Sequence, residues 1–205
     1  TDTPKTIFLK DYIQPDYWVE TVDLKVELGE ESTIVESSLK LFRREDASAE
    51  APLVLDGQDM ELLSITLDGQ DLSEERYTVA PESLTVEGLP EKFVLVTRVA
   101  IKPQENTSLE GLYKASGIFC TQCEAEGFRK ITYYLDRPDV MASFSTTIIG
   151  DGAAYPVMLS NGNPVDQGKL EDGRTWVKWV DPFKKPAYLF ALVAGDLRSI
   201  EDTYT

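Results

Sequence analysis

Hydrophobic and polar residues alternate with a period of two along much of the chain. Between residues 22 and 28 every second residue is Val or Leu, and Asp, Lys or Glu fill the positions between them. Residues 35–41 and 92–101 repeat this alternation. Successive side chains of a strand point to opposite faces, so each of these segments has one apolar and one more polar face. The pattern predicts half-buried antiparallel strands.

Shorter apolar runs separated by turn residues extend the strand pattern. They are residues 53–55, 62–67, 77–79, 84–86, 118–122, 143–149, 157–159, 175–180 and 188–194. Asp-Gly and Asn-Gly pairs, which favour tight turns, lie between several of them. Helix signals are confined to residues 125–133 and, after Pro138, to residues 139–142. We therefore expect an all-β fold, an antiparallel β-sandwich or saddle with one or two short helices.

The charge of the chain restricts its partners. Its 20 basic and 36 acidic residues give a formal net charge of -16. A field of that sign repels phosphate backbones and anionic lipid heads, so neither nucleic acid nor a membrane is an expected partner. The first ten residues do not resemble a signal peptide. Two cysteines do not make a disulfide framework, and we expect a reducing, cytoplasmic location.

The sequence contains no histidine. This excludes Ser-His-Asp and Cys-His mechanisms and the His-rich catalytic zinc sites from the chain itself. Cys120 and Cys123 have the spacing of a thioredoxin motif, but such a motif needs a βαβ context that the pattern does not provide. Two thiols on a strand are the favoured interpretation, and a redox role is the alternative. We predict no catalytic residue and no metal ligand in this chain.

Candidate binding residues lie within residues 117–144. Gln122 and Glu124 are two positions apart, so an extended backbone would point both side chains to the same side. A carboxamide beside a carboxylate suits a primary ammonium, which carries three donors and one positive charge. The alternative is that Glu124 caps the following helix and Gln122 satisfies backbone groups. Further along, Arg137 between Asp136 and Asp139 is typical of a pinned loop.

The run TQCEAEGFRKITYYLDRPDVMASF, residues 121–144, closely resembles a signature of the bacterial aminopeptidase N family of zinc metalloaminopeptidases. The flanking segments agree in order along essentially the whole chain. They are FLKDY (8–12), LVLDG (53–57), SLEGLYKASGIF (108–119), LSNGN (159–163) and VKWVDPFKKPAYLFALVAGDL (177–197).

The resemblance implies a non-catalytic N-terminal β domain over residues 1–200, with residues 201–205 beginning the linker to a thermolysin-like catalytic domain. That domain carries the HExxH zinc motif, which does not occur here, so the chain alone should be inactive. Zinc is accordingly expected in the absent catalytic domain and not in this chain. The parent enzyme would release N-terminal amino acids from peptides.

Gln122 and Glu124 match the family's TQxE motif. By resemblance, the Glu binds the free amino terminus of the peptide substrate and the Gln lines the pocket for its first side chain. The expected partners are thus a peptide N-terminus and the downstream catalytic domain. The alternative is a free-standing β-sandwich that binds another molecule. A domain that normally has a covalent neighbour should expose an apolar patch, whereas an independent module should not.

Overall fold

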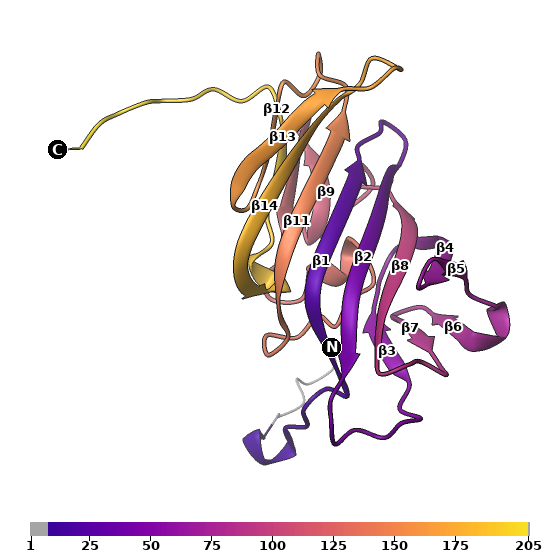
Figure 1. Ribbon diagram of the computed structural model, residues 1–205. Helices are drawn as coiled ribbons and strands as arrows, with labels where there is room; N and C mark the ends of the chain where they lie inside the picture. The colour runs from indigo at the N-terminus through magenta and orange to yellow at the C-terminus, as the bar shows by residue number, and fades with distance from the viewer. Residues whose placement is uncertain (1–7, 205) are drawn as a thin grey trace.

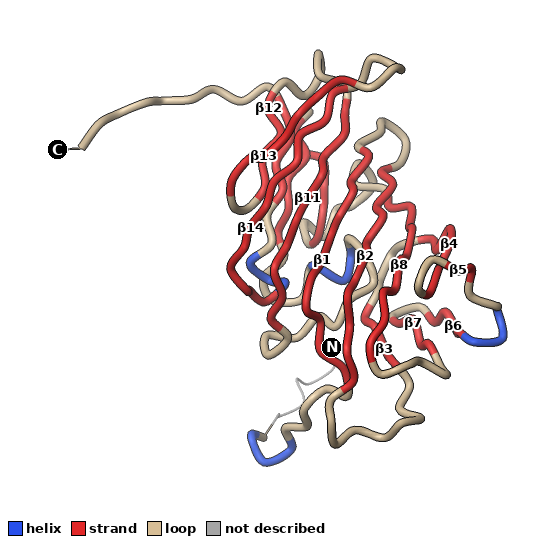
Figure 2. The backbone as a smooth tube through the Cα atoms, viewed as in Figure 1, coloured by secondary structure: helices blue, strands red, loops and turns tan. Residues whose placement is uncertain are grey.

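The computed structural model describes residues 8–204, so residues 1–7 of the predicted domain and the last residue of the predicted linker lie outside the described part. The all-β prediction is confirmed, because these residues form fifteen strands and no α-helix (Figure 1, Figure 2). The strands are β1 (Tyr17–Glu27), β2 (Thr33–Arg43), β3 (Leu53–Asp56), β4 (Glu61–Leu67), β5 (Gln70–Asp71), β6 (Tyr77–Ala80), β7 (Ser83–Val86), β8 (Lys92–Ile101), β9 (Gly111–Ala115), β10 (Ile118–Gln122), β11 (Met141–Gly150), β12 (Val157–Ser160), β13 (Asn163–Lys169), β14 (Thr175–Pro186) and β15 (Leu192–Gly195).

One large twisted sheet dominates the fold. Its strand order is β13-β14-β11-β1-β2-β8-β4-β5, with β1 and β2 near its centre (Figure 1). All neighbours in it are antiparallel except β1 and β11, which run parallel. The large sheet is therefore mixed at this one pair and antiparallel at every other. A parallel pair requires a crossover connection, here the long path through the smaller sheets between β1 and β11.

Two small antiparallel sheets complete the structure. One has the order β12-β15-β10-β9 and the other β3-β7-β6. They pack against the same face of the large sheet, which is the face that carries the apolar residues of the alternating segments. Val22, Leu24 and Val26 of β1 are at most 1% exposed. The core that results is continuous, and side chains from all three sheets contribute to it.

The two predicted helices are wrong in extent or position. Residues 125–133 contain only one turn of 3-10 helix, η3 (Phe128–Lys130), and residues 139–142 are not helical because β11 begins at Met141. The other short turns are η1 (Leu9–Asp11), η2 (Glu74–Arg76) and η4 (Ala187–Leu189). The β-branched residues Ile131 and Thr132 disfavour a longer helix after η3, and both are buried.

The strands that the sequence did not indicate lie at sheet edges. β5, β9 and β13 are the outermost strands of their sheets. β13 reads NPVDQGK and is almost wholly exposed, so it has no apolar alternation to reveal it. After β15 the described chain runs on without regular structure and extends away from the sheets (Figure 1). Among residues 8–204 no helix is long and apolar enough to cross a membrane.

Candidate functional site

Gln122 and Glu124 lie at the point where β10 ends. Gln122 is the last residue of the strand and pairs with Gly111 of β9, while Glu124 belongs to the turn that follows. Both side chains are exposed, and the Nε2 of Gln122 donates a hydrogen bond of 3.1 Å to the main-chain oxygen of Glu124. The structure thus places the two residues side by side, although by a turn and not by the continuous strand that the spacing suggested.

Cys123, which lies between Gln122 and Glu124 in the sequence, is buried in the core. Its side chain is 3% exposed, whereas its two neighbours in sequence point to solvent. Burial, with a smaller contribution from the charge of Asp136, raises the pKa of the Cys123 thiol to about 12. A thiol with such a pKa is not a redox nucleophile at neutral pH, and no disulfide joins it to Cys120. The buried cysteine instead acts as a small apolar anchor for the backbone.

The turn after Glu124 is closed tightly against β9. The amide of Gly127 donates to the main-chain oxygen of Cys123 at 2.8 Å. A Cβ on Gly127 would lie 2.3 Å from the oxygen of Gln122 and 2.8 Å from the nitrogen of Gly111, so only glycine fits. Gly111 itself has a φ of +72° and touches the turn from the other side. Gly111 and Gly127 therefore allow the backbones of β9 and of the turn to approach closely next to Gln122 and Glu124.

An ionic cluster holds the far end of the turn. Asp136 Oδ2 accepts both the main-chain N–H and the Nε–H of Arg129, each at 3.1 Å. The main-chain N–H of Asp136 in turn donates to Asp56 Oδ2 at 3.1 Å. The side chain of Asp136 is 3% exposed and that of Arg129 15%. Burial raises the pKa of the Asp136 carboxyl, against the opposing effect of Arg129.

This cluster differs from the sequence expectation. Arg137 pairs with Asp139, through Nε at 2.9 Å and a terminal nitrogen at 2.8 Å, so the prediction of a pinned loop is confirmed for these two residues. Asp136 has Arg129 as its partner instead. No local pattern indicates this pairing, and the cluster also includes Asp56, eighty residues from Asp136 in the sequence.

The aromatic core lies directly behind η3. Phe128 is fully buried, and its ring packs edge-on against those of Tyr134, Phe144 and Phe190 at centroid distances of 5.0, 5.9 and 5.3 Å. These rings come from the segment before β11, from β11 itself and from the residues before β15. One side chain therefore ties the turn that carries Glu124 to β11 and to the segments that precede β11 and β15.

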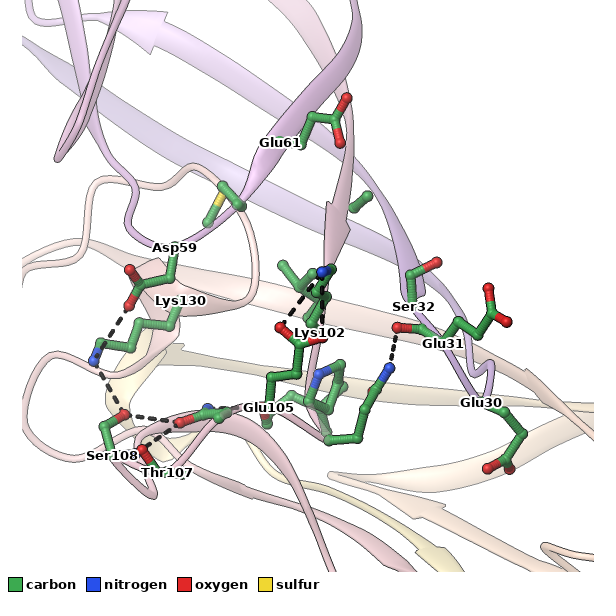
Figure 3. A pocket seen from close by; sticks show the side chains of 17 residues that line it. Glu30, Glu31, Ser32, Asp59, Glu61, Lys102, Glu105, Thr107, Ser108 and Lys130 are labelled. Atoms are coloured by element: carbon green, nitrogen blue, oxygen red, sulfur yellow. Dashed lines mark hydrogen bonds and ion pairs between the residues drawn. The ribbon is translucent and has the colours of Figure 1, made fainter.

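A large hollow lies elsewhere on the described part of the chain. It has a volume of about 1150 Å³ and lies between the β1–β2 loop, the residues before β4 and the β8–β9 loop (Figure 3). Lys102 is paired with Glu105, and Lys130 contacts Asp59 and Ser108. Neither Gln122 nor Glu124 lines this hollow. We therefore assign it no part in the candidate site.

The comparison with known families decides the identity of the fold. Residues 19–189 match the Peptidase M1 N-terminal domain. The chain belongs to this family. The match includes Gln122, Glu124 and the ionic cluster of Arg129 and Asp136.

Individual relatives of this M1 N-terminal domain agree. The chain is 48% identical over its full length to aminopeptidase N of Escherichia coli strain K12 and 48% identical to aminopeptidase N of Caulobacter vibrioides. It spans only 23% of the length of each. Among solved structures, aminopeptidase A of Legionella pneumophila in complex with aspartic acid is 37% identical, with a TM-score of 0.87 over 93% of this chain and 22% of that one. The M1 zinc metallopeptidase of Deinococcus radiodurans, 21% identical with a TM-score of 0.76 over 89% of this chain and 43% of that one, shares the fold.

The described residues of this M1 domain do not fit a zinc ion. Across residues 8–204 no group of three or more His, Cys, Asp or Glu side chains is placed to hold a metal. Histidine is missing from the whole sequence. The acidic residues of the cluster at Arg129 are already engaged by that guanidinium and by backbone N–H groups. The described residues therefore supply no step of metal chemistry.

Proposed function

We propose that this M1 N-terminal domain holds the free amino terminus of a peptide substrate in a zinc-dependent aminopeptidase, and that Gln122 and Glu124 are the residues that do so. The catalytic residues and the zinc would belong to another part of a longer polypeptide. We also propose a reducing, cytoplasmic location, which the unpaired thiols of Cys120 and Cys123 support.

The free carboxylate of Glu124 carries the proposal. Among the described residues no Lys or Arg is ion-paired with Glu124, while Glu126, two positions on, lies 3.5 Å from Arg129. Glu124 can therefore accept a cation from outside the chain. The side chain of Gln122 lies next to it, and its hydrogen bond to the main-chain oxygen of Glu124 limits its freedom.

The chemistry of the two groups suits an ammonium. A primary ammonium donates three hydrogen bonds, and two carboxylate oxygens and a carboxamide oxygen can accept them. A carboxylate binds a terminal ammonium most strongly where water is excluded. Gln122 and Glu124 are exposed, so they would bind it at full strength only when the rest of the protein covers them. Holding the amine at a fixed point decides which peptide bond meets the catalytic groups.

The test is a matched pair of variants in the full-length enzyme. Glu124→Gln keeps the shape of the side chain and removes its charge. We expect kcat/KM for an alanyl substrate to fall, with a loss of transition-state stabilisation of about 2–4 kcal/mol, as for loss of a close charge pair. Glu126→Gln makes the same chemical change two residues away, where the carboxylate serves Arg129, and should leave kcat/KM nearly unchanged. Equal effects of the two substitutions would refute the assignment.

A further inference from the structure

Residues 108–111, which lead into β9, have an unusual backbone. Leu109 has a φ of +59° and Gly111 a φ of +72°, so two residues of this short segment lie in the left-handed region. That region is strained for a leucine, because its Cβ crowds the backbone there. The side chain of Leu109 is 55% exposed, so its own packing does little to hold this conformation. The segment therefore depends on contacts made by its neighbours.

Lys130, the last residue of η3, contacts the segment at two points. Its Nζ donates a hydrogen bond of 3.2 Å to Ser108 Oγ (Figure 3) and lies 3.0 Å from Glu110 Oε2. The ammonium thus bridges the residues on either side of Leu109. The side chain of Lys130 is 14% exposed, so these partners satisfy donors that have little access to water.

The side chain of Asn106 fixes the shape of the same segment. Its Nδ2 donates to the main-chain oxygens of Glu110 and Leu112 at 2.7 and 3.0 Å. Its Oδ1 accepts the main-chain N–H and the hydroxyl of Ser108 at 3.1 and 2.8 Å. All four hydrogen bonds stay within residues 106–112, so they shape the segment without attaching it to η3. That attachment comes from Lys130.

The segment ends in Gly111, which touches the candidate site. Gly111 pairs with Gln122, the last residue of β10. A Cβ on Gly111 would lie 2.7 Å from the Cβ of Lys130 and 3.0 Å from the main-chain oxygen of Gly127, in the turn that carries Glu124. The start of β9 is therefore in contact with β10, with this turn and with η3. A shift of residues 108–111 would displace the backbone that carries Gln122 and Glu124.

We propose that Lys130 is a positioning residue for the binding of the substrate's amino terminus. By holding residues 108–111 against η3, it fixes the backbone that carries Gln122 and Glu124. The inference rests on the proposed function and adds to it a residue that acts through the backbone. Groups that are held in the bound geometry before the ligand arrives bind it more strongly. Without the charge of Lys130 the strained segment relaxes, and Gly111 moves with it.

The experiment compares Lys130→Met with Lys102→Met in the full-length enzyme. Both substitutions keep the aliphatic stem and remove the charge, and both lysines line the same hollow (Figure 3). Lys102 pairs at 3.2 Å with Glu105, which lies outside residues 108–111. We expect Lys130→Met to raise KM for an alanyl substrate about tenfold with little change in kcat, below the roughly 10²-fold cost of a 1 Å misplacement. Lys102→Met should change neither constant.

Three further measurements separate positioning from a general loss of structure. Lys130→Arg keeps the charge and the donors, so its KM should stay close to that of the wild type. In the Glu124→Gln background, Lys130→Met should raise KM less than about twofold, because the positioned group has already lost its charge. A dipeptide inhibitor that lacks the terminal amine should bind the wild type and Lys130→Met equally. If Lys130→Met does not fold, as judged by thermal melting, Glu110→Gln breaks the same ion pair from its exposed side and should also raise KM without lowering kcat.

Several results would overturn the positioning role. One is a KM for Lys130→Met, or for Glu110→Gln in its place, that matches the KM for Lys102→Met. Another is an equal rise of KM in the wild-type and Glu124→Gln backgrounds, which would show that Lys130 acts on another part of the enzyme. If Glu124→Gln itself leaves kcat/KM unchanged, the proposed function fails and this inference fails with it. If Glu124→Gln lowers kcat/KM and Lys130→Met has no effect, only the positioning role fails.

Discussion

The ionic cluster beneath Glu124 allows an unusually well-controlled prediction. Asp136 accepts the main-chain N–H and the Nε–H of Arg129, and Asp172 accepts the same two groups of Arg174, at 3.0 and 2.8 Å. Asp136 accepts both groups through Oδ2, and Asp172 accepts them through its two separate oxygens. The pairs are thus closely similar, but the side chain of Asp136 is 3% exposed and that of Asp172 is 52% exposed. The two sites therefore separate the effect of burial from that of hydrogen bonding.

Asp136→Asn should destabilise the fold strongly. Removing one partner of a buried ion pair costs about 3–5 kcal/mol, because the remaining charge loses its compensation. Arg129 keeps contacts with Glu126 at 3.5 Å and Asp56 at 3.8 Å, so we expect the lower end, about 3 kcal/mol. Asp172→Asn should have little measurable effect, as for most exposed pairs.

The assay is urea unfolding followed by the fluorescence of the tryptophans. A loss of about 3 kcal/mol corresponds to a midpoint lower by about 1 M or more at the usual dependence on urea. Asp172→Asn should leave the midpoint almost unchanged. Equal midpoint shifts for the two variants would show that burial does not set the strength of this cluster, and the reasoning would fail.

Three further predictions concern the surroundings of the site. Gly127→Ala should lower the free energy of unfolding in urea by about 1–3 kcal/mol, because the new methyl group would overlap the backbones of Gln122 and Gly111. The control Gly150→Ala should cost less, because its new Cβ would meet the nearest side chain at 3.4 Å. Equal costs for the two variants would count against the tight turn. Hydrogen bonds from Arg137, and to a lesser extent from Tyr12, lower the pKa of Asp139, so its contribution to stability is present above its unfolded pKa of about 3.9 and is lost as the pH falls through the folded value. The difference in unfolding free energy between the wild type and Asp139→Asn should thus shrink below about pH 4, and a constant difference would contradict this. Cys123, whose pKa burial raises to about 12, should resist thiol reagents at pH 8 until the protein unfolds, and rapid modification of the native protein would show that its thiol is accessible.

The strands were predictable where one face is apolar. Residues 92–101 and 118–122 were expected as strands, and the structure gives the same limits for β8 and β10. Alternation revealed them because burial selects every second residue of such a strand. β13 is exposed on both sides and depends on pairing with β14, so its sequence carries no such signal. The parallel pairing of β1 with β11 depends on the crossover between them, which no local pattern encodes.

The candidate site was partly predictable for a similar reason. Gln122 and Glu124 stood out by their spacing and by resemblance, and the structure brings them side by side. The turn that does so was not foreseen, because it depends on contacts of Gly127 with Gly111 and on the pairing of Asp136 with Arg129. These contacts depend on how the segments pack in three dimensions, and a sequence pattern read over a few residues does not report them.

The most direct measurement of the central claim is a binding cycle with two ligands and two proteins. The ligands are a dipeptide inhibitor and its analogue without the terminal amine, and the proteins are the full-length enzyme and its Glu124→Gln variant. If Glu124 holds the amine, loss of the amine and loss of the charge should each weaken inhibition, and the double change should add little, with a coupling of about 2–4 kcal/mol. Fully additive effects, with a coupling near zero, would mean that Glu124 does not bind the amino terminus.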